Sequence, residues 1–415
     1  MGYGSIAAGC RRCAWSLSGI LLLALGAQAA VAAAVPIYPT TANITSTADR
    51  MISYRNQQHS WQTSDGAVHI MVNRGSQPTG DSLALYSSFD GGVTWNQMFT
   101  LAGTDEFSTS DGTLATIGTT ANLLLVYGTA QATGTILYAS ASYNPAAQTW
   151  TLGTPQTVFA DSTMAGSNPA FGSDAAGNFW CGFTAQDLTT LQYQEDLVYR
   201  APKSTQWTNT GLVFGSGSNL QHSARPVPYK NGMAMIYESG TTMYWAYRLN
   251  TWPLTQAWTT SVMFTGLPPY SQDPYGTHYS VVADAANNLH LTLIANQQLL
   301  YMRYLTSTGK WGPVRALTTT AINAAYSQAT IAGSNVMLFV NNQQSIEVLQ
   351  STDNGNTFTI TQSLLHTTPP PGSSLYYGNP RIETPSYATS PVPAWQQFVN
   401  GPIQGLLFFE VPVIK

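Results

Sequence analysis

Apolar and polar residues alternate at a period of two through most of the chain after residue 35. Such alternation, interrupted by Gly, Asn, Asp and Pro, predicts short β-strands joined by turns, and no stretch after residue 35 carries the 3.6-residue period of an amphipathic helix. One unit recurs about fifty residues apart: a polar opening, a strand, a Gly or Asn turn and a more apolar strand. It occurs at 60–75, 111–128, 168–185, 223–239, 278–296, 326–342 and 379–400.

Each unit is followed by a third alternating run and then by a run that carries an aromatic residue. Four short strands per repeat, arranged around a centre, describe a β-propeller, a fold that leaves only short, protected sheet edges. The seventh repeat offers three strands before the sequence ends, and residues 35–45 could supply its missing outer strand. The sequence therefore predicts an all-β protein with a single β-propeller of seven four-stranded blades, six being the alternative count, whose last blade is closed by an N-terminal strand.

Residues 1–35 have the character of an export signal. Arg11 and Arg12 precede a long apolar run, and a small-x-small cleavage site ends at Ala29. We expect the mature propeller domain to cover 36–415 and to be secreted, periplasmic or extracellular. An uncleaved membrane anchor is the alternative, because the apolar run is about long enough to span a bilayer. After cleavage, no stable membrane insertion is expected.

Composition narrows the classes of function. Only 8% of residues are Asp, Glu, Lys or Arg, the formal net charge is −4, and the 15 basic residues are scattered. The electrostatic footprint of a nucleic-acid-binding protein is therefore missing, and we expect no nucleic-acid partner. Removal of the signal would leave Cys181 as the remaining cysteine, so no disulfide framework is expected within one chain.

One turn motif occurs twice, between the third and fourth strands predicted for the first and sixth repeats. Both copies have the spacing Ser-x-Asp-x-Gly-x-Thr-aromatic. The Asp side chain can accept N–H bonds within the turn, the Gly allows positive φ, and the aromatic ring can pack between neighbouring sheets. The residues are Ser88, Asp90, Gly92, Thr94 and Trp95 in one copy and Ser351, Asp353, Gly355, Thr357 and Phe358 in the other.

This spacing resembles the Asp box, or BNR repeat, of the sialidase-like β-propellers. In that family the box is structural and lies away from the active face. The resemblance implies that Asp90 and Asp353 do no chemistry, and that a glycan or polysaccharide site should be sought on the opposite face, around the central channel.

Polar and aromatic residues stand at the predicted openings of the inner strands, which a propeller brings to one face. Tyr237 and Glu238, at the end of a second strand, should point to the same face. Arg pairs a carboxylate bidentately, and His or Tyr can transfer protons, so this set suits an acidic sugar. The residues at the openings are His59, Asp111, Asn168, His222, Arg225, His278, Tyr279, Tyr326, Asn379, Arg381 and Glu383.

Similarity to propeller polysaccharide lyases implies one assignment of roles. Arg225 would neutralise a uronate carboxylate, while His222 or His278, with Tyr279 or Tyr237, would remove the C5 proton and protonate the leaving oxygen. The expected substrate-binding residues are Arg225, Arg381, His59, Asp111, Asn168 and Tyr326, and the expected catalytic residues are His222, His278, Tyr279, Tyr237 and Glu238.

Other readings stay open. Similarity to sialidases implies a Tyr237–Glu238 nucleophile pair and Asp111 as acid/base. It also implies an arginine triad of Arg225, Arg381 and a third arginine such as Arg55 or Arg74. A non-catalytic lectin or adhesion module would suit the low charge. Polar residues at inner-strand openings can also serve only to satisfy backbone groups. Three histidines could suggest zinc, but no short ligand spacing supports it, so no metal or other cofactor is expected.

Overall fold

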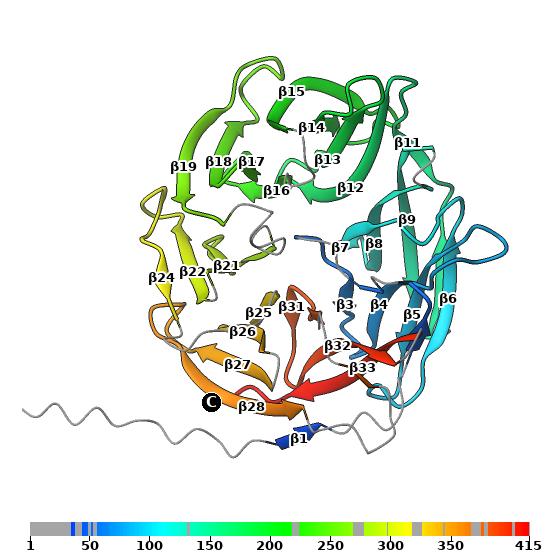
Figure 1. The fold of residues 1–415 in the computed structure, drawn as a ribbon, viewed down its shortest axis with the longest axis vertical. Coiled ribbons are helices and arrows are strands. Elements are labelled where there is room, and N and C mark those ends of the chain that lie inside the picture. Colours follow the sequence, from blue (N-terminus) through cyan, green and yellow to red (C-terminus); the bar gives the residue numbers. More distant parts are fainter. Residues whose placement is uncertain are drawn as a thin grey trace, which may run out of the picture.

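The computed structural model of the chain is a ring of seven β-sheets, each built on antiparallel strands, around a central axis (Figure 1). The described part contains strands, turns and loops, and no helix. The structure describes residues 35–37, 44–48, 51–52, 56–130, 133–217, 224–268, 278–296, 298–317, 326–342, 345–366, 375–376, 381–400 and 403–414.

The first four blades each follow the chain outward from an inner strand. Blade 1 is β3 (Ser60–Gln62), β4 (Val68–Asn73), β5 (Leu83–Ser88) and β6 (Asn96–Leu101). Blade 2 is β7 (Ser110–Ile117), β8 (Thr120–Gly128), β9 (Ile136–Asn144), β10 (Thr149–Leu152) and β11 (Gln156–Phe159). Blade 3 is β12 (Met164–Ser173), β13 (Phe179–Asp187), β14 (Tyr193–Arg200) and β15 (Thr208–Gly217). Blade 4 is β16 (Ala224–Tyr229), β17 (Gly232–Ser239), β18 (Thr242–Leu249) and β19 (Thr259–Thr265).

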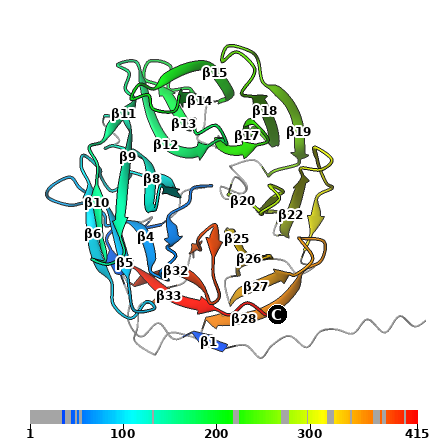
Figure 2. The same cartoon turned by 180° about the vertical axis from the view of Figure 1, so that it is seen from behind.

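The remaining three blades complete the ring, which Figure 2 shows from behind. Blade 5 is β20 (Tyr279–Ala283), β21 (Leu289–Ala295), β22 (Gln298–Leu305), β23 (Lys310–Trp311) and β24 (Arg315–Ala316). Blade 6 is β25 (Ser327–Ala332), β26 (Asn335–Asn342), β27 (Ser345–Ser351) and β28 (Thr359–His366), with β31 (Tyr387–Ala388) and β1 (Val35–Ile37) at its edges. Blade 7 is β29 (Leu375–Tyr376), β30 (Ile382–Glu383), β32 (Val392–Asn400), β33 (Ile403–Val411) and β2 (Ile44–Ser46).

An N-terminal strand closes the last blade, as the sequence predicts. β2 pairs antiparallel with β33, and Ile44 lies opposite Leu406. The preceding strand, β1, runs parallel to β28 at the edge of blade 6, where Val35 lies opposite Leu364. Both chain ends are thereby hydrogen-bonded into neighbouring blades. The predicted count of seven four-stranded blades is confirmed. The predicted export signal lies almost wholly outside the described residues.

Neighbouring blades pack face to face through apolar and aromatic side chains. The second strands β4 and β21 are buried along their whole length, because one blade covers each side of the sheet. Trp245 of blade 4 lies 5.4 Å from Tyr304 of blade 5, and Phe159 of blade 2 lies 4.7 Å from Phe183 of blade 3, measured between ring centroids. Such pairs stabilise the ring beyond their buried area.

Both copies of the repeated turn motif form the same hydrogen-bonded turn, between β5 and β6 and between β27 and β28. In the first copy Thr94 donates from its backbone N and its hydroxyl to the Asp90 carboxylate, at 2.9 and 2.6 Å, and Ser88 donates to Asp90 at 2.8 Å. Hydrogen bonds from Thr94 lower the pKa of Asp90 from 3.8 to about 2. Those from Thr357 do the same for Asp353.

The aromatic residue of the first turn packs across a blade boundary. Trp95 lies 5.8 Å from Trp395 and 5.5 Å from Phe408 of blade 7. A Cβ at Gly92 would overlap the Phe408 ring, and Gly92 has a φ of +85°. Only glycine meets both requirements here. The turn therefore joins blade 1 to blade 7.

Candidate functional site

Strand direction gives the ring two distinct faces. Because the sheets are antiparallel, the starts of the inner strands share one face with the connections between second and third strands. We call this the entrance face. The two turn motifs connect third to fourth strands and so lie on the opposite face. Most of the described residues predicted as site residues lie at the starts of the inner strands, toward the entrance face.

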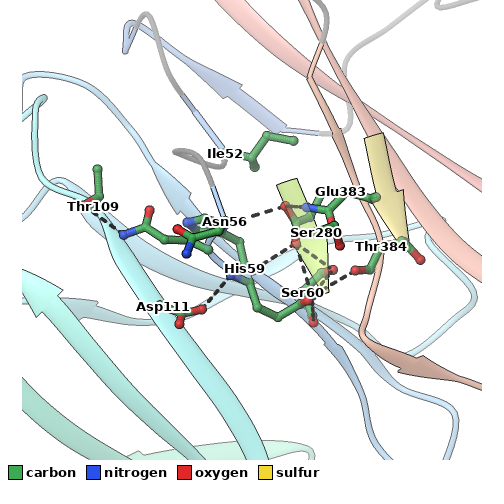
Figure 3. A network of polar contacts seen from close by, with 12 residues as sticks. Ile52, Asn56, His59, Ser60, Thr109, Asp111, Ser280, Glu383 and Thr384 are labelled. Atoms are coloured by element: carbon green, nitrogen blue, oxygen red, sulfur yellow. Dashed lines mark hydrogen bonds and ion pairs between the residues drawn. The ribbon is translucent and has the colours of Figure 1, made fainter. Parts of the chain in front are cut away.

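A short segment, 56–59, stands immediately before β3, and its Asn56 and His59 lie in a network of polar contacts with Asp111 and Glu383 close by (Figure 3). Its side chains and backbone contact five other blades, which supply Asp111, Pro169, Arg225, Tyr279 and Glu383. The contacts are Gln58 N to Asp111 Oδ1 at 2.6 Å, Gln57 Nε2 to Pro169 O at 2.8 Å, Asn56 Nδ2 to Tyr279 Oη at 2.9 Å, His59 N to Glu383 Oε1 at 3.0 Å, and the Arg225 guanidinium to Asn56 O. We call residues 56–59 the central segment.

Asp111 and Arg225, both expected to bind substrate, contact the central segment and each other. The Asp111 side chain has no exposed surface. It accepts hydrogen bonds from Gln58 N, from Phe171 N at 2.7 Å and from the Arg225 guanidinium at 3.1 Å. A buried charge with this many donors is well compensated. Their polar groups are thus directed toward the protein interior.

Glu383 plays the equivalent part on the other side of the central segment. Its Oε1 accepts from His59 N and, at 3.2 Å, from Gln58 Nε2, while Gln328 Nε2 donates to its Oε2 at 3.4 Å. His59 Nδ1 lies 3.6 Å from Oε2, which forms an ion pair whenever the imidazole is protonated. His59 is itself buried.

Tyr279 and Tyr237, the tyrosines expected to act in a lyase reaction, are both buried. Tyr279 is buried, and its hydroxyl donates to Ile236 O at 2.9 Å while accepting from Asn56. The Tyr237 ring stacks on Tyr244 at 5.1 Å and 13° between blades 3 and 4, and burial raises the pKa of Tyr237. Glu238 is the next residue of β17, so its side chain points to the opposite face of the sheet.

Three other predicted residues come together at the entrance face, one from each of blades 5, 6 and 7. The rings of His278 and Tyr326 lie 4.6 Å apart, and the Arg381 guanidinium lies over the Tyr326 ring, 4.9 Å from its centroid. His278, Tyr326 and Arg381 are 7%, 3% and 2% exposed. We call these three residues the His-Tyr-Arg cluster. A guanidinium over an aromatic face is a favourable cation–π geometry.

A cavity of about 540 Å³ opens between blades 1, 2 and 3 on the same face. His59 and Asn168 from the sequence-predicted set line it, together with Ser110, Gln186 and Tyr193. Asn168 has a φ of 50° at an irregularity in the pairing of β12 with β13. We call this the entrance cavity.

A second, smaller cavity of about 230 Å³ lies where the inner strands end, on the far face. Arg225 lines it, beside Gln58 and Trp61. The central segment and its partners therefore stand between the two cavities. His222, Asn379 and Arg55 fall outside the described residues.

Sequence reasoning missed the importance of the residues that precede the first inner strand. Gln57 and Gln58 hydrogen-bond to Pro169, Asp111 and Glu383, which belong to blades 3, 2 and 7. The signal was the polar run Asn-Gln-Gln-His directly before β3.

Within the described ranges, no group of three or more His, Cys, Asp or Glu side chains could hold a metal ion. The same residues include no helix of a length and hydrophobicity suited to crossing a bilayer.

Solved structures with the same architecture include polysaccharide lyases. The chain is similar to an ulvan lyase from a new polysaccharide lyase family, with a TM-score of 0.51 and 10% identity over 88% of this chain and 96% of that one. It is also similar to an ulvan lyase bound to -[GlcA(1-4)Rha3S]-, with a TM-score of 0.50, 10% identity and the same coverage. These likenesses show the propeller fold.

A prolyl endopeptidase aligns at a TM-score of 0.46 and 8% identity over 89% of this chain. The chain spans about half the length of that protein, 51%. No protein-family model and no curated protein matches the sequence.

Proposed function

We propose that this chain is a secreted, carbohydrate-active propeller that cleaves a uronate-containing polysaccharide by β-elimination at the His-Tyr-Arg cluster. The observation that carries the proposal is the contact of His278, Tyr326 and Arg381, which three different blades bring to one place on the entrance face. These side chains supply the three functions that the reaction needs: a base, an acid and a cation.

The reaction proceeds by proton abstraction beside a carboxylate. Pairing of the uronate carboxylate with Arg381 neutralises its charge and makes the C5 proton easier to remove. His278 takes that proton, and the C5–H electron pair forms the C4–C5 double bond. The C4–O bond breaks, its electron pair leaves with the oxygen, and that oxygen takes the Tyr326 proton. The products are an unsaturated uronate and a new chain end, with no water consumed.

This assignment moves two roles away from the residues favoured by the sequence. Arg225 already pairs with Asp111, and the Tyr279 hydroxyl already has a donor and an acceptor. Arg381 and Tyr326 take the neutralising and proton-donating roles because they adjoin His278. A similar solved structure that holds a glucuronate-containing fragment supports the choice of substrate class.

Sialidase-type hydrolysis has less support. A nucleophile pair needs Tyr and Glu in contact, whereas successive residues of β17 point to opposite faces. Of the arginines considered for a triad, Arg225 is paired and Arg74 donates to Asp81 O and Gln97 Oε1 in blade 1. We nevertheless infer kinship with the Asp-box propellers from the two matching turns.

Cleavage products test the proposal directly. Purified protein is incubated with uronate polymers and sialylated glycans, and products are read by mass spectrometry and by the ultraviolet absorbance of the new double bond. Tyr326→Phe should lower turnover about 10²-fold or more, since proton transfer contributes that much. Tyr86→Phe, which removes a hydroxyl from blade 1, is the matched control and should retain activity. Fragments that have gained the mass of one water would show hydrolysis and would contradict the lyase proposal.

One observation favours a second candidate, a glycan-binding module without catalysis. The three cluster residues expose at most 7% of their surface, which leaves little area for a substrate. Retained binding to one polysaccharide, with no product from it, would establish this alternative. Export itself is tested by sequencing the N-terminus of the protein recovered outside the cytoplasm, which should begin between residues 30 and 36.

A further inference from the structure

We propose that the entrance cavity is a separate binding site for an uncharged sugar residue. Its volume of about 540 Å³ lies within the range of small-molecule sites. It is distinct from the His-Tyr-Arg cluster, because blades 1, 2 and 3 and the segment between β2 and β3 form it, and none of the three cluster residues lines it.

The lining combines apolar and hydroxyl- or amide-bearing side chains, as a sugar ring requires. Sugars present C–H groups on their faces and hydroxyl groups around their edges, so apolar surface and short polar groups must alternate around them. The apolar residues include Met51, Ile52, Met71, Leu83, Phe107 and Ala165, and the polar residues include Asn73, Ser108, Thr109, Ser110, Ser167, Asn168 and Gln186.

Ser110 gives an independent indication of a ligand. This serine is 1% exposed and lines the cavity, and its Oγ has no hydrogen-bond partner among the described residues. A buried hydroxyl without a partner is costly, and most such groups in proteins are satisfied. A sugar hydroxyl at this wall would supply the missing hydrogen bond.

Phe107 supplies an aromatic surface at the rim. It is 64% exposed, which is unusual for a large apolar side chain. The turn that carries it is held by the hydrogen bond from Phe107 N to Asp105 Oδ1 at 3.0 Å. An exposed ring beside a polar cavity presents a flat face to the C–H groups of a sugar.

Charge distinguishes this site from the cluster. Among the described residues that line the entrance cavity, Glu106 is the one carboxylate, and none is Lys or Arg. A uronate or sulfate bound there would meet the like charge of Glu106, and no described residue of the lining offers a compensating cation, which disfavours binding. His59, the other titratable group in the lining besides Tyr193, already faces Glu383.

The two sites are connected through Gln397. Its side-chain Oε1 accepts from Met51 N at 3.1 Å at the cavity wall, and its backbone N donates to Arg381 O at 2.9 Å in the cluster. If the cluster holds a uronate, which rests on the proposed function, the polymer carries an uncharged residue as well as that uronate. Binding of the uncharged sugar alone does not depend on it.

The test measures binding of single sugars, so that it is independent of cleavage. Methyl glycosides of neutral hexoses, deoxyhexoses and pentoses, and of the matching uronic acids, are titrated by calorimetry and by saturation-transfer NMR. At least one neutral glycoside should bind, and its uronate counterpart should bind at least tenfold more weakly. Phe107→Ala and Ser110→Ala should each weaken the neutral sugar about tenfold.

Control variants separate the two proposals. Ile117→Ala removes an exposed apolar side chain at the other end of β7 and should leave binding unchanged. Arg381→Lys should abolish cleavage while sparing the neutral sugar. Glu106→Gln should raise uronate affinity toward that of the neutral sugar. The inference is overturned if no neutral glycoside binds, if the uronate binds equally well, or if Phe107→Ala and Ser110→Ala, with unchanged melting temperatures, bind as the wild type does.

Discussion

Replacing Asp111 by Asn tests whether the central segment stabilises the ring. The substitution keeps the side-chain shape and one oxygen acceptor for Gln58 N. It also removes the charge that pairs with Arg225, and it turns an NH₂ donor toward the donors of Phe171 and Arg225.

The magnitude follows from the burial of the pair. The Asp111 side chain has no exposed surface and that of Arg225 is 12% exposed, so solvent screens the interaction poorly. Breaking a buried ion pair by removing one partner costs about 3–5 kcal/mol. We expect Asp111→Asn to lower the free energy of unfolding by about that amount.

Urea unfolding followed by tryptophan fluorescence and circular dichroism measures the loss, with the midpoint reporting stability and the slope reporting exposed surface. Arg225→Met and the double variant complete a cycle, which isolates the pair from the backbone hydrogen bonds. The double variant should be less destabilised than the sum of the two single variants. A loss below about 1 kcal/mol in Asp111→Asn, or additive losses in the cycle, would refute the reasoning.

Three further outcomes concern the turns and the buried histidine. Gly92→Ala should lower the melting temperature well beyond Gly91→Ala, because both have positive φ but only the former would overlap the ring of Phe408; equal effects would contradict the packing argument. The depressed pKa values of Asp90 and Asp353 give stability that is complete above pH 3.8 and is lost as the pH falls toward about 2. Thermal melts of a double Asp→Ala variant should therefore depend less on pH in that range, and an unchanged dependence would reject this role. Burial lowers the pKa of His69 from 6.5 to about 3, so between these pH values the imidazole is protonated in the unfolded chain and neutral in the folded one. The free energy of unfolding therefore falls as the pH drops from 6.5 toward 3. His69→Gln should reduce this dependence of the free energy of unfolding on pH.

The repeat and the strand count could be predicted from the sequence because both are local properties. Alternation at a period of two and turn residues at fixed positions are visible in any window, and Ser-x-Asp-x-Gly-x-Thr closes its own hydrogen bonds within a few residues. The closing role of the N-terminal strand also followed, because three strands in the seventh repeat left one position empty.

The arrangement at the centre could not be predicted because its contacts join distant parts of the chain. The residues that Gln57 and Gln58 reach lie as far along the sequence as Glu383. Nothing local distinguishes Arg225, which pairs with Asp111, from Arg381, which lies on Tyr326. Both were expected to bind substrate. Which side chain each contacts depends on how the blades are arranged around the ring.

The central segment has an evolutionary consequence. Propellers change their blade number when a repeat is duplicated or lost, and a ring held mainly by contacts between adjacent blades can absorb such a change. Here one short stretch before the first blade matches particular partners on five others. Gain or loss of a repeat would move those partners relative to the segment. The buried carboxylates of Asp111 and Glu383 would then lose hydrogen-bond donors. The contacts of the central segment therefore tie the stability of the ring to a count of seven blades.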